Sequence, residues 1–322
     1  MLNRDDILDS LEYVVNHSKH VKTNHEAIEK FVSVFTLSAT THWSHAYPLG
    51  YIPQTQLADE IEFLFLIGNQ AFCYWGSPKW TIEYKGQKLD GWWAAVACFQ
   101  RAIEKGVPIL DGKYLAKMSL EQARELFAGT PDIPLLKERQ LMLNQIGQVL
   151  VKKYRGRFSN FFFSSNTYSL NLVQNIAKTF TGFDDFAKYK DRKVYFFKKA
   201  QLVVNDIYHA LPQNHPRQIT GITDLTGTAD YKIPAILRKM GILVYTEEFA
   251  QKIDQCLEIP ERSEPEIEIR AHQLWSVKLI YERLKEKYPI LTSGIIQDIL
   301  WIKSQDKSVL NKPYHHTKTI YY

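Results

Sequence analysis

The sequence predicts a mostly α-helical fold, and three observations support this prediction. Hydrophobic residues recur at intervals of three and four along most of the chain, which is the spacing of an amphipathic helix. Alternation typical of a strand is confined to one short stretch at residues 80–85. The composition, with 45% hydrophobic and 13% aromatic residues among 322, is that of a globular protein whose core is rich in rings.

The first three predicted elements are helices. A hydrophobic stripe over residues 7–15 follows Asn3, which we expect to cap the helix. A second stripe covers residues 28–35. The run at residues 56–75 is apolar on nearly all sides, which indicates a buried central helix rather than a surface helix.

One short β-hairpin is expected next. Trp80, Ile82 and Tyr84 alternate with polar neighbours, and Gly86-Gln87 supplies a turn. Helical patterns then continue toward the C-terminus, several of them bounded by capping residues, Gly or Pro. The expected helices cover residues 91–106, 119–129, 134–155, 169–180, 196–211, 229–241 and 263–284.

We expect a single unit over residues 1–322, because no linker rich in Gly or Ser and no fixed-period repeat divides the chain. Any division into two packed helical lobes would be internal to that unit. The three cysteines show no CxxC pairing, which favours a reducing compartment. The N-terminus lacks the layout of a signal peptide, and the longest apolar stretch, residues 61–68, is too short to span a membrane. These features predict a soluble, cytoplasmic protein.

Charge and motifs limit the possible functions. The net charge of +5 is spread along the chain without a basic block, so a small anionic ligand is favoured over a stable nucleic-acid partner. There is no P-loop, no GxGxxG after a strand, no HExxH and no GxSxG. His315-His316 is the only adjacent histidine pair, and neighbouring side chains point apart. We therefore do not expect metal catalysis.

The segment 221–241 is the most informative for chemistry. A short turn at residues 226–228 leads into a helix, and Asp230 lies at or near the start of that helix. Backbone N–H groups at a helix start favour an ionised carboxylate. From the pattern alone, an N-cap aspartate is the favoured interpretation. A hairpin entering a helix that presents one Asp is also the active-site layout of helix-hairpin-helix glycosylases, in which the carboxylate stabilises a sugar cation and orients water.

Lys198 and a group of aromatic residues are further candidates. A lysine on such a helical stretch is usually a surface residue, but if Lys198 turns inward it could pair with Asp230. Asp206, eight residues on, shares roughly the same helix face as Lys198. Most of the aromatic rings are expected to fill the core, and one or two could form a slot in which a base stacks. This aromatic group consists of Phe72, Tyr74, Trp75, Trp80, Trp92 and Trp93.

Several stretches resemble, in order and spacing, the queuosine 5′-phosphate N-glycosylases, also called queuosine-salvage proteins. The resemblance extends over nearly the whole chain, and such distributed matching is more specific than any single motif. The matching stretches are Arg101-Ala102 with Gly106 and Pro108-Ile109, Glu138-Arg139 with Asn144 and Gly147, Phe197-Lys198-Lys199-Ala200-Gln201 with Asp206, Ala229-Asp230-Tyr231-Lys232-Ile233-Pro234 with Leu237 and Leu243, Glu266-Ile267-Glu268-Ile269-Arg270 with Trp275, and Pro313-Tyr314-His315 with Ile320-Tyr321-Tyr322.

The resemblance implies an all-helical fold akin to the helix-hairpin-helix DNA glycosylases. It also implies hydrolysis of the N-glycosidic bond of queuosine 5′-monophosphate, with release of queuine and ribose 5-phosphate and without metal or cofactor. On this basis Asp230 is expected to be catalytic and Lys198 to support it. The residues expected to bind the substrate are His45, Phe72, Trp75, Asp206, Tyr231 and Lys232.

Four positions depart from the family pattern. Where the family carries Asp-x-x-Asn-Phe-x-Phe-Trp, this chain has Gly68 and Ala71 at the two polar positions. Thr228 stands where a Phe is expected, and Gln100 where an Asn is expected. Because groups that hydrogen-bond a base strongly affect specificity, the released base could be queuine or another 7-deazaguanine.

Two alternative functions stay open at this point. A DNA or RNA base glycosylase of the helix-hairpin-helix class would need a broad positive surface near Gly227, against which the modest charge argues. A non-catalytic protein that binds a modified nucleoside would not need both Asp230 and Lys198. The sequence does not predict the oligomeric state or the ligands of the phosphate.

Overall fold

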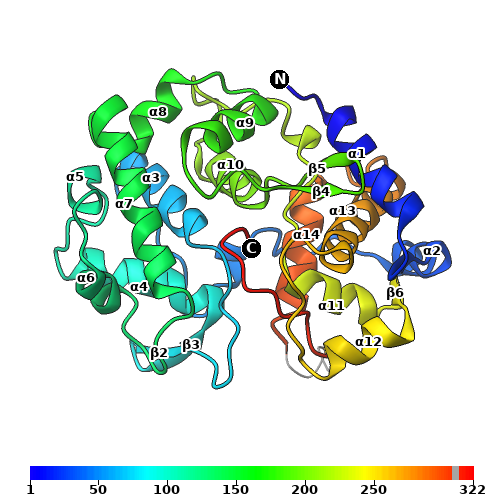
Figure 1. The fold of residues 1–322 in the computed structure, drawn as a ribbon. Coiled ribbons are helices and arrows are strands. Elements are labelled where there is room, and N and C mark those ends of the chain that lie inside the picture. The colour runs from blue at the N-terminus through cyan, green and yellow to red at the C-terminus, as the bar shows by residue number, and fades with distance from the viewer. Residues whose placement is uncertain (307–311) are drawn as a thin grey trace.

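The computed structural model describes residues 1–306 and 312–322, and it confirms the mostly helical fold (Figure 1). Two short 3-10 helices, η1 (Trp43–Ala46) and η2 (Ile222–Asp224), accompany the α-helices. The described α-helices are α1 (Arg4–His17), α2 (His25–Val34), α3 (Leu57–Asn69), α4 (Gly91–Glu104), α5 (Gly112–Leu115), α6 (Leu120–Leu126), α7 (Leu136–Lys153), α8 (Phe158–Ser164), α9 (Ser169–Thr179), α10 (Lys198–Ala210), α11 (Lys232–Lys239), α12 (Glu247–Asp254), α13 (Glu264–Leu284) and α14 (Ser293–Lys303).

Three antiparallel strand pairs occur among the described residues, so the prediction of a single hairpin is wrong in number. The expected hairpin is present as β2 (Thr81–Tyr84) with β3 (Gln87–Asp90). A second hairpin pairs β4 (Phe186–Tyr189) with β5 (Arg192–Tyr195). The third pair joins β1 (Val21–Thr23) to β6 (Leu243–Tyr245), far apart in the sequence. The predicted hairpin has a glycine in its turn, whereas the second hairpin has none and the third pair joins distant segments, so no local turn signal indicated these two pairs.

Capping and burial explain the helices that were predicted. Asn3 forms a capping box at the start of α1, and Ser119 forms another at the start of α6. Helix α3 is buried along most of its length, as its apolar sequence indicates, but it ends at Asn69. The rest of the apolar run, residues 71–75, is therefore irregular rather than helical.

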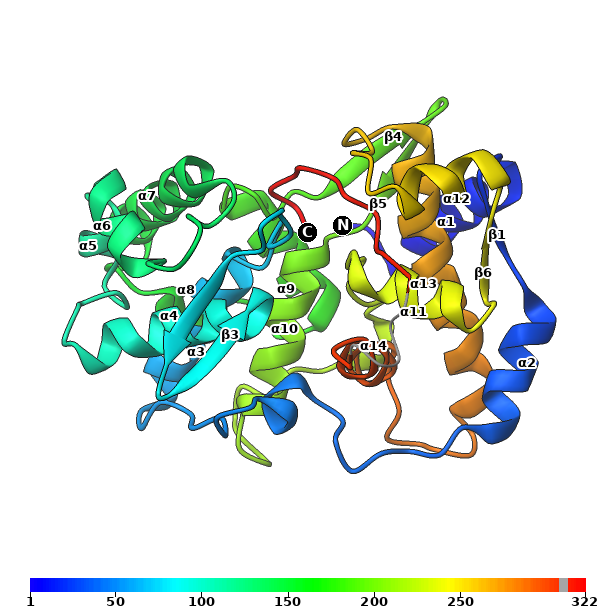
Figure 2. The same cartoon turned by 90° about the horizontal axis from the view of Figure 1, so that it is seen from below.

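Two large hydrophobic cores lie side by side (Figure 2). The larger core is built mainly by α3, α4 and the helices from α6 to α10, with α1 packed at its edge. The smaller core is built by α2, β1, β6 and the helices from α11 to α14. Trp275 and Trp301 pack against both cores, so the surfaces of the two cores meet at these rings.

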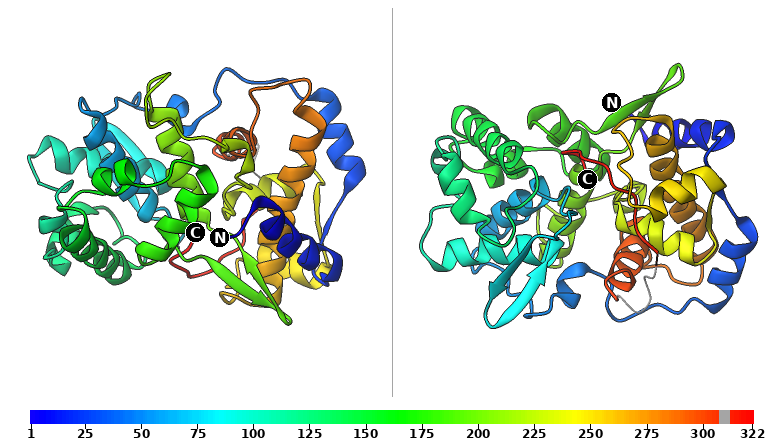
Figure 3. Two further views of the ribbon diagram at one scale, coloured as in Figure 1. Left: turned by 90° about the horizontal axis from the view of Figure 1, so that it is seen from above. Right: turned by 60° about the horizontal axis from the view of Figure 1, so that its bottom comes forward.

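The C-terminal segment 312–322 runs between the two cores (Figure 3). The Tyr322 carbonyl accepts a hydrogen bond from the Cys73 N–H at 2.9 Å, and the His316 carbonyl accepts one from the Ile259 N–H at 2.7 Å. This segment therefore connects the loop after α3 with the loop before α13. None of the helices within the described residues combines the length and apolar character needed to cross a membrane.

Candidate active site

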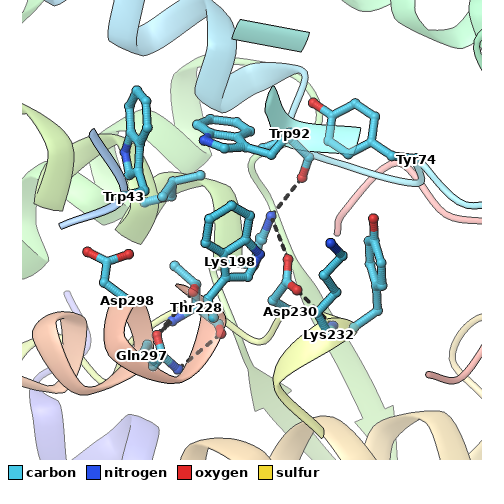
Figure 4. Close-up of a pocket in the computed structure, with 13 residues that line it drawn as sticks. Trp43, Tyr74, Trp92, Lys198, Thr228, Asp230, Lys232, Gln297 and Asp298 are labelled. Carbon is cyan, nitrogen blue, oxygen red and sulfur yellow. Dashed lines mark hydrogen bonds and ion pairs between the residues drawn. The ribbon is translucent and has the colours of Figure 1, made fainter. Parts of the chain in front are cut away.

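A cavity lies where the two cores meet (Figure 4). The space between its walls, together with its open mouth, amounts to about 590 Å³. One wall comes from the segments around η1, α3, α4 and α10, and the other from the start of α11 and one face of α14. The lining residues are Trp43, Ala71, Tyr74, Trp92, Lys198 and Leu202 on the first wall, and Thr228, Asp230, Tyr231, Lys232, Gln297, Asp298 and Trp301 on the second.

Asp230 both holds the start of α11 and faces a cation. Its Oδ1 accepts a hydrogen bond from the Lys232 N–H at 2.8 Å, so the capping interpretation is correct in part. Its Oδ2 lies 3.6 Å from the Nζ of Lys198. The Asp230 carboxyl group is therefore held between the start of α11 and the Lys198 ammonium.

Lys198 is turned inward, at the first turn of α10. Its side chain is only 5% exposed, and its Nζ donates to the Ala71 carbonyl at 2.7 Å. Its backbone N–H donates to Asp185, which is held in turn by the guanidinium of Arg270 at 2.6 and 3.0 Å. Burial lowers the pKa of Lys198, while the carboxylates of Asp230 and Asp185 oppose that shift. The inward orientation left open by the sequence is thus the one adopted.

The loop at residues 69–73 turns successive carbonyl groups toward buried cations. Lys199 Nζ donates to the Asn69 carbonyl at 3.0 Å. Arg139 donates to the carbonyls of Gln70, Phe72 and Cys73 at 2.8, 2.5 and 3.1 Å. Burial lowers the pKa of Lys199 well below its usual value, and the neighbouring Lys198 adds to this shift. Lys199 is therefore a buried residue that stabilises this loop.

Two glutamine side chains hold the Thr228 segment in place. Gln201 Oε1 accepts hydrogen bonds from the N–H groups of Thr226 and Gly227 at 2.8 and 3.0 Å. Gln297 accepts from the Thr228 N–H and hydroxyl, and its Nε2 donates to the Thr228 carbonyl at 3.0 Å. These bonds set the position of Asp230, which follows two residues later.

Aromatic rings supply the apolar surface of the cavity. Trp43 and Trp92 pack edge to face, with ring centroids 5.3 Å apart. Trp301, from α14, packs against Trp93 with centroids 4.8 Å apart. Such flat faces can stack a planar base.

The structure brings only some of the expected substrate-binding residues to this cavity. Tyr231 and Lys232 line it, whereas Phe72 is buried beneath the Arg139 guanidinium, 4.0 Å from the ring centroid. Trp75 stacks on His316 with centroids 4.4 Å apart. These two rings lie behind the loop at residues 69–73 and do not line the cavity.

His45 and Asp206 line a neighbouring cavity, which shares Trp43 with the first. Asp206 Oδ1 accepts a hydrogen bond from Trp43 Nε1 at 3.1 Å and lies 3.0 Å from His42 Nε2. Burial opposes protonation of His42, but Asp206, Asp298 and Glu60 together raise the pKa of this imidazole.

Sequence reasoning missed α14 and the polar residues that it contributes. Gln297 and Asp298 follow the apolar residues Ile295 and Ile296, and Thr292 caps the helix. The capping Thr before an apolar run was the available signal. Burial raises the pKa of Asp298 to about 7, with the nearby His42 opposing and Asp206 adding to the shift.

One set of possible metal ligands occurs within residues 1–306 and 312–322, and the cavity does not contain it. The set is His20, Glu264 and Glu268, near the start of α13. Glu268 already accepts hydrogen bonds from the backbone N–H groups of Lys19 and His20. These contacts give Glu268 a structural role at this position.

Comparison with known proteins adds a family match. A family model described as queuosine salvage protein matches residues 51–322. The chain is 33% identical over 324 residues to a Sphaerobacter thermophilus protein named queuosine 5′-phosphate N-glycosylase/hydrolase, covering 98% of this chain and 97% of the relative. A Mus musculus protein of the same name is 28% identical, with 98% of each chain covered. A Schizosaccharomyces pombe protein of that name is 27% identical over 73% of this chain and 72% of its own.

Proposed function

Because the chain belongs to the queuosine salvage protein family, we propose that it is an N-glycosylase acting on queuosine 5′-monophosphate. It hydrolyses the N-glycosidic bond and releases queuine and ribose 5-phosphate for queuine salvage. The observation that carries this proposal is the Asp230–Lys198 pair, 3.6 Å apart on the wall of a cavity lined by aromatic rings. We also propose that the enzyme acts in the cytoplasm without a stable nucleic-acid partner.

Asp230 is the catalytic carboxylate in this proposal. As the bond between C1′ and the base breaks, positive charge develops on the ribose, and a fixed carboxylate in a partly dry cavity stabilises it. The Asp230 side chain is 13% exposed, so water is largely excluded around it. The same carboxylate orients the water that attacks C1′. Lys198 holds the carboxylate in place and favours its ionised form.

The base lies against the indoles of Trp43, Trp92 and Trp301 in this proposal. Of the four positions that depart from the family pattern, Ala71 and Thr228 line the cavity directly. The alanine and threonine side chains are smaller than the asparagine and phenylalanine of the family pattern, so the base has room on both walls. We propose queuine as the released base.

Lys232 is the cation placed to meet the 5′-phosphate. It is the first residue of α11, where backbone N–H groups favour an anion, and its side chain lines the cavity beside Asp230. Its Nζ donates to Gln305 Oε1 at 2.6 Å. Tyr231 precedes it and packs on Tyr314 with centroids 4.9 Å apart, which fixes this end of the cavity.

The remaining expected residues keep supporting roles in the proposal. His45 and Asp206 lie beyond Trp43, and we propose that they contact the part of the substrate that extends past that ring. Phe72 and Trp75 support the loop at residues 69–73 from behind.

Base release from three substrates tests the proposal. Purified protein is incubated with queuosine 5′-monophosphate, free queuosine and queuosine-containing tRNA, and free base is measured by chromatography. We expect queuine chiefly from the monophosphate. Release chiefly from tRNA would favour a nucleic-acid glycosylase, and tight binding of the nucleotide without any turnover would favour a non-catalytic binding protein.

A further inference from the structure

Asp298 is a second carboxyl group on the wall of the cavity that contains Asp230. It comes from α14, and Figure 4 shows it at the left of the view, with Thr228 and Gln297 drawn between it and Asp230. Its Oδ2 is shielded from solvent and has no hydrogen-bond partner within the described residues. A carboxyl oxygen in that position is costly unless a ligand satisfies it, which makes Asp298 a candidate for direct contact with substrate.

The two carboxyl groups lie in different electrostatic surroundings. Asp230 faces the ammonium of Lys198 and the start of α11, with Lys232 beside it. Among the described residues Asp298 forms no ion pair with a lysine or arginine; the charged groups that act on it are His42, from the segment before η1, and Asp206, from α10. His42 is already engaged with Asp206 at 3.0 Å. Burial and Asp206 raise the pKa of Asp298 to about 7, so a large fraction of this carboxyl group carries a proton at neutral pH.

The base needs such a proton in order to leave as a neutral molecule. An ordinary purine can be activated for departure by protonation at N7, but a 7-deazaguanine has carbon at that position. The electron pair of the broken bond must therefore be neutralised at another atom of the ring system. When the surroundings of two carboxyl groups in one site shift their pKa values apart, one group can stay protonated and act as an acid. The other stays ionised and can stabilise positive charge.

We propose that Asp298 is the general acid that protonates the departing base while Asp230 stabilises the ribose cation, a role that rests on the proposed function. The bond between C1′ and N9 breaks and its electron pair goes to the base. The Asp298 proton goes to O6 or N3 of the base, which leaves as a neutral tautomer and moves that proton to N9 in water. Water adds its hydroxyl to C1′ and gives its proton to Asp230, from which it passes to solvent. Asp298 takes a proton back from solvent, so the net reaction is hydrolysis.

The test compares two leaving groups in wild type and in Asp298→Asn. One substrate is queuosine 5′-monophosphate. The other is 4-nitrophenyl β-ribofuranoside 5-phosphate, whose phenolate departs without a proton. Loss of a general acid should lower kcat for queuosine 5′-monophosphate by about a hundredfold or more and leave kcat for the nitrophenyl substrate within roughly threefold. Asp132→Asn, a matched loss of an exposed carboxylate that pairs with Arg124, should leave both rates unchanged.

A pH profile of the wild-type enzyme gives a second test that needs no variant. The kcat for queuosine 5′-monophosphate should fall as pH rises through about 7, because the protonated form of Asp298 is lost. The nitrophenyl substrate should show no such decrease, and Asp298→Asn should abolish it.

Each other outcome contradicts the proposal in a distinguishable way. Equal losses on both substrates would make Asp298 a structural residue, and a wild-type kcat that stays level above pH 7 would exclude an acid of this kind. If wild type releases queuine and the variant keeps its kcat, only the general-acid assignment fails. If wild type releases no queuine, the proposed function fails with it.

Discussion

Lys198 connects the backbone of one core to the carboxylate of the other. Its Nζ donates to the Ala71 carbonyl and lies 3.6 Å from Asp230 Oδ2, so a single side chain positions both the loop after α3 and Asp230, two residues before α11. Lys199, the next residue, binds only the loop side, through the Asn69 carbonyl. Adjacent lysines therefore have separable roles, and the roles can be tested against each other.

Asp230→Asn should remove activity while leaving the fold intact. The amide oxygen can still accept the Lys232 N–H, so the start of α11 keeps its hydrogen bond. A neutral amide cannot stabilise a cationic ribose as a carboxylate does, and kcat should fall on the order of a hundredfold or more. Turnover of queuosine 5′-monophosphate and the thermal unfolding midpoint measure the two effects. Near-normal turnover in the variant would mean that Asp230 only caps the helix and is not catalytic.

Lys198→Met should lower kcat by about tenfold or more, because the variant releases Asp230 and leaves the Ala71 carbonyl without its donor. Lys199→Met is the matched control. It removes the ammonium that binds the Asn69 carbonyl but no contact of Asp230, so its main effect should be on the free energy of unfolding rather than on kcat. Single-turnover rates and denaturant unfolding of both variants provide the comparison. Equal kinetic losses would mean that Lys198 acts only through the loop.

The residues of the site were predictable to different degrees. Asp230 and Lys198 could be identified because the segments that carry them resemble a known family. The burial of Lys199 could not, since helical periodicity does not reveal that a carbonyl-rich loop lies opposite. Asp298 gave no signal of its own, because a single Asp in an apolar run looks like a solvated residue until the neighbouring core is in place.

At the level of elements, the crossing of α3 and α10 explains one departure from the family pattern. Gly68 lies in α3 directly over Val203 of α10, and a Cβ added at Gly68 would overlap the Val203 Cγ2. The two helices can approach this closely only because residue 68 has no side chain. An aspartate at this position would press on the Val203 side chain, so either Val203 or α10 would have to shift.

Gly68→Ala should therefore destabilise the protein by about 1–3 kcal/mol, as expected for overpacking a core. In the Val203→Ala background the clash is absent, and the same change should become neutral or stabilising, since Ala is favoured over Gly in a helix by ~1 kcal/mol. Denaturant unfolding of the four proteins of this cycle measures the coupling. Additive changes in the free energy of unfolding would show that a side chain at position 68 does not clash with Val203.

Element prediction succeeded where the hydrophobic pattern was long and failed where it was short. Helix α7 was expected over residues 134–155 and is found at Leu136–Lys153. The β4–β5 hairpin turns at residues 190–191, where Lys190 adopts φ 53° without the Asn or Gly that would mark such a turn. The β1–β6 pair depends on packing between residues more than 200 positions apart in the sequence, which no local pattern can indicate.

At the level of the whole molecule, the cavity exists only because the two cores meet. Asp230, Lys232 and Asp298 come from elements of the smaller core, and Lys198, Trp43 and Trp92 from those of the larger one. Ligand contacts on both walls would hold the cores together, so a bound nucleotide should stabilise the fold as a unit. A site assembled in this way is suited to a substrate small enough to be enclosed.

The last prediction concerns the form of the substrate. Lys232 lines the cavity beside Asp230, and its ammonium, oriented by Gln305, is the group proposed to meet a 5′-phosphate. A charge-assisted contact worth ~1.4 kcal/mol or more should give the monophosphate at least a tenfold higher kcat/KM than free queuosine. Lys232→Met should bring the two values together, while Lys239→Met, at the exposed end of α11, should not. Equal kcat/KM values for nucleotide and nucleoside in wild type would contradict a contact between the protein and the 5′-phosphate.

Burial of Lys232 decides how salt affects this preference. Lys232 is only 8% exposed, and buried charge pairs are screened by salt far less than surface pairs. The ratio of kcat/KM values should therefore change little between low and moderate salt, whereas a contact made by surface lysines would weaken steeply. Intact tRNA should be a poor substrate at any ionic strength, because its nucleotide is tethered on both sides and cannot enter a cavity closed by two cores. Efficient release of queuine from tRNA, with a rate that collapses as salt rises, would instead place recognition on the protein surface.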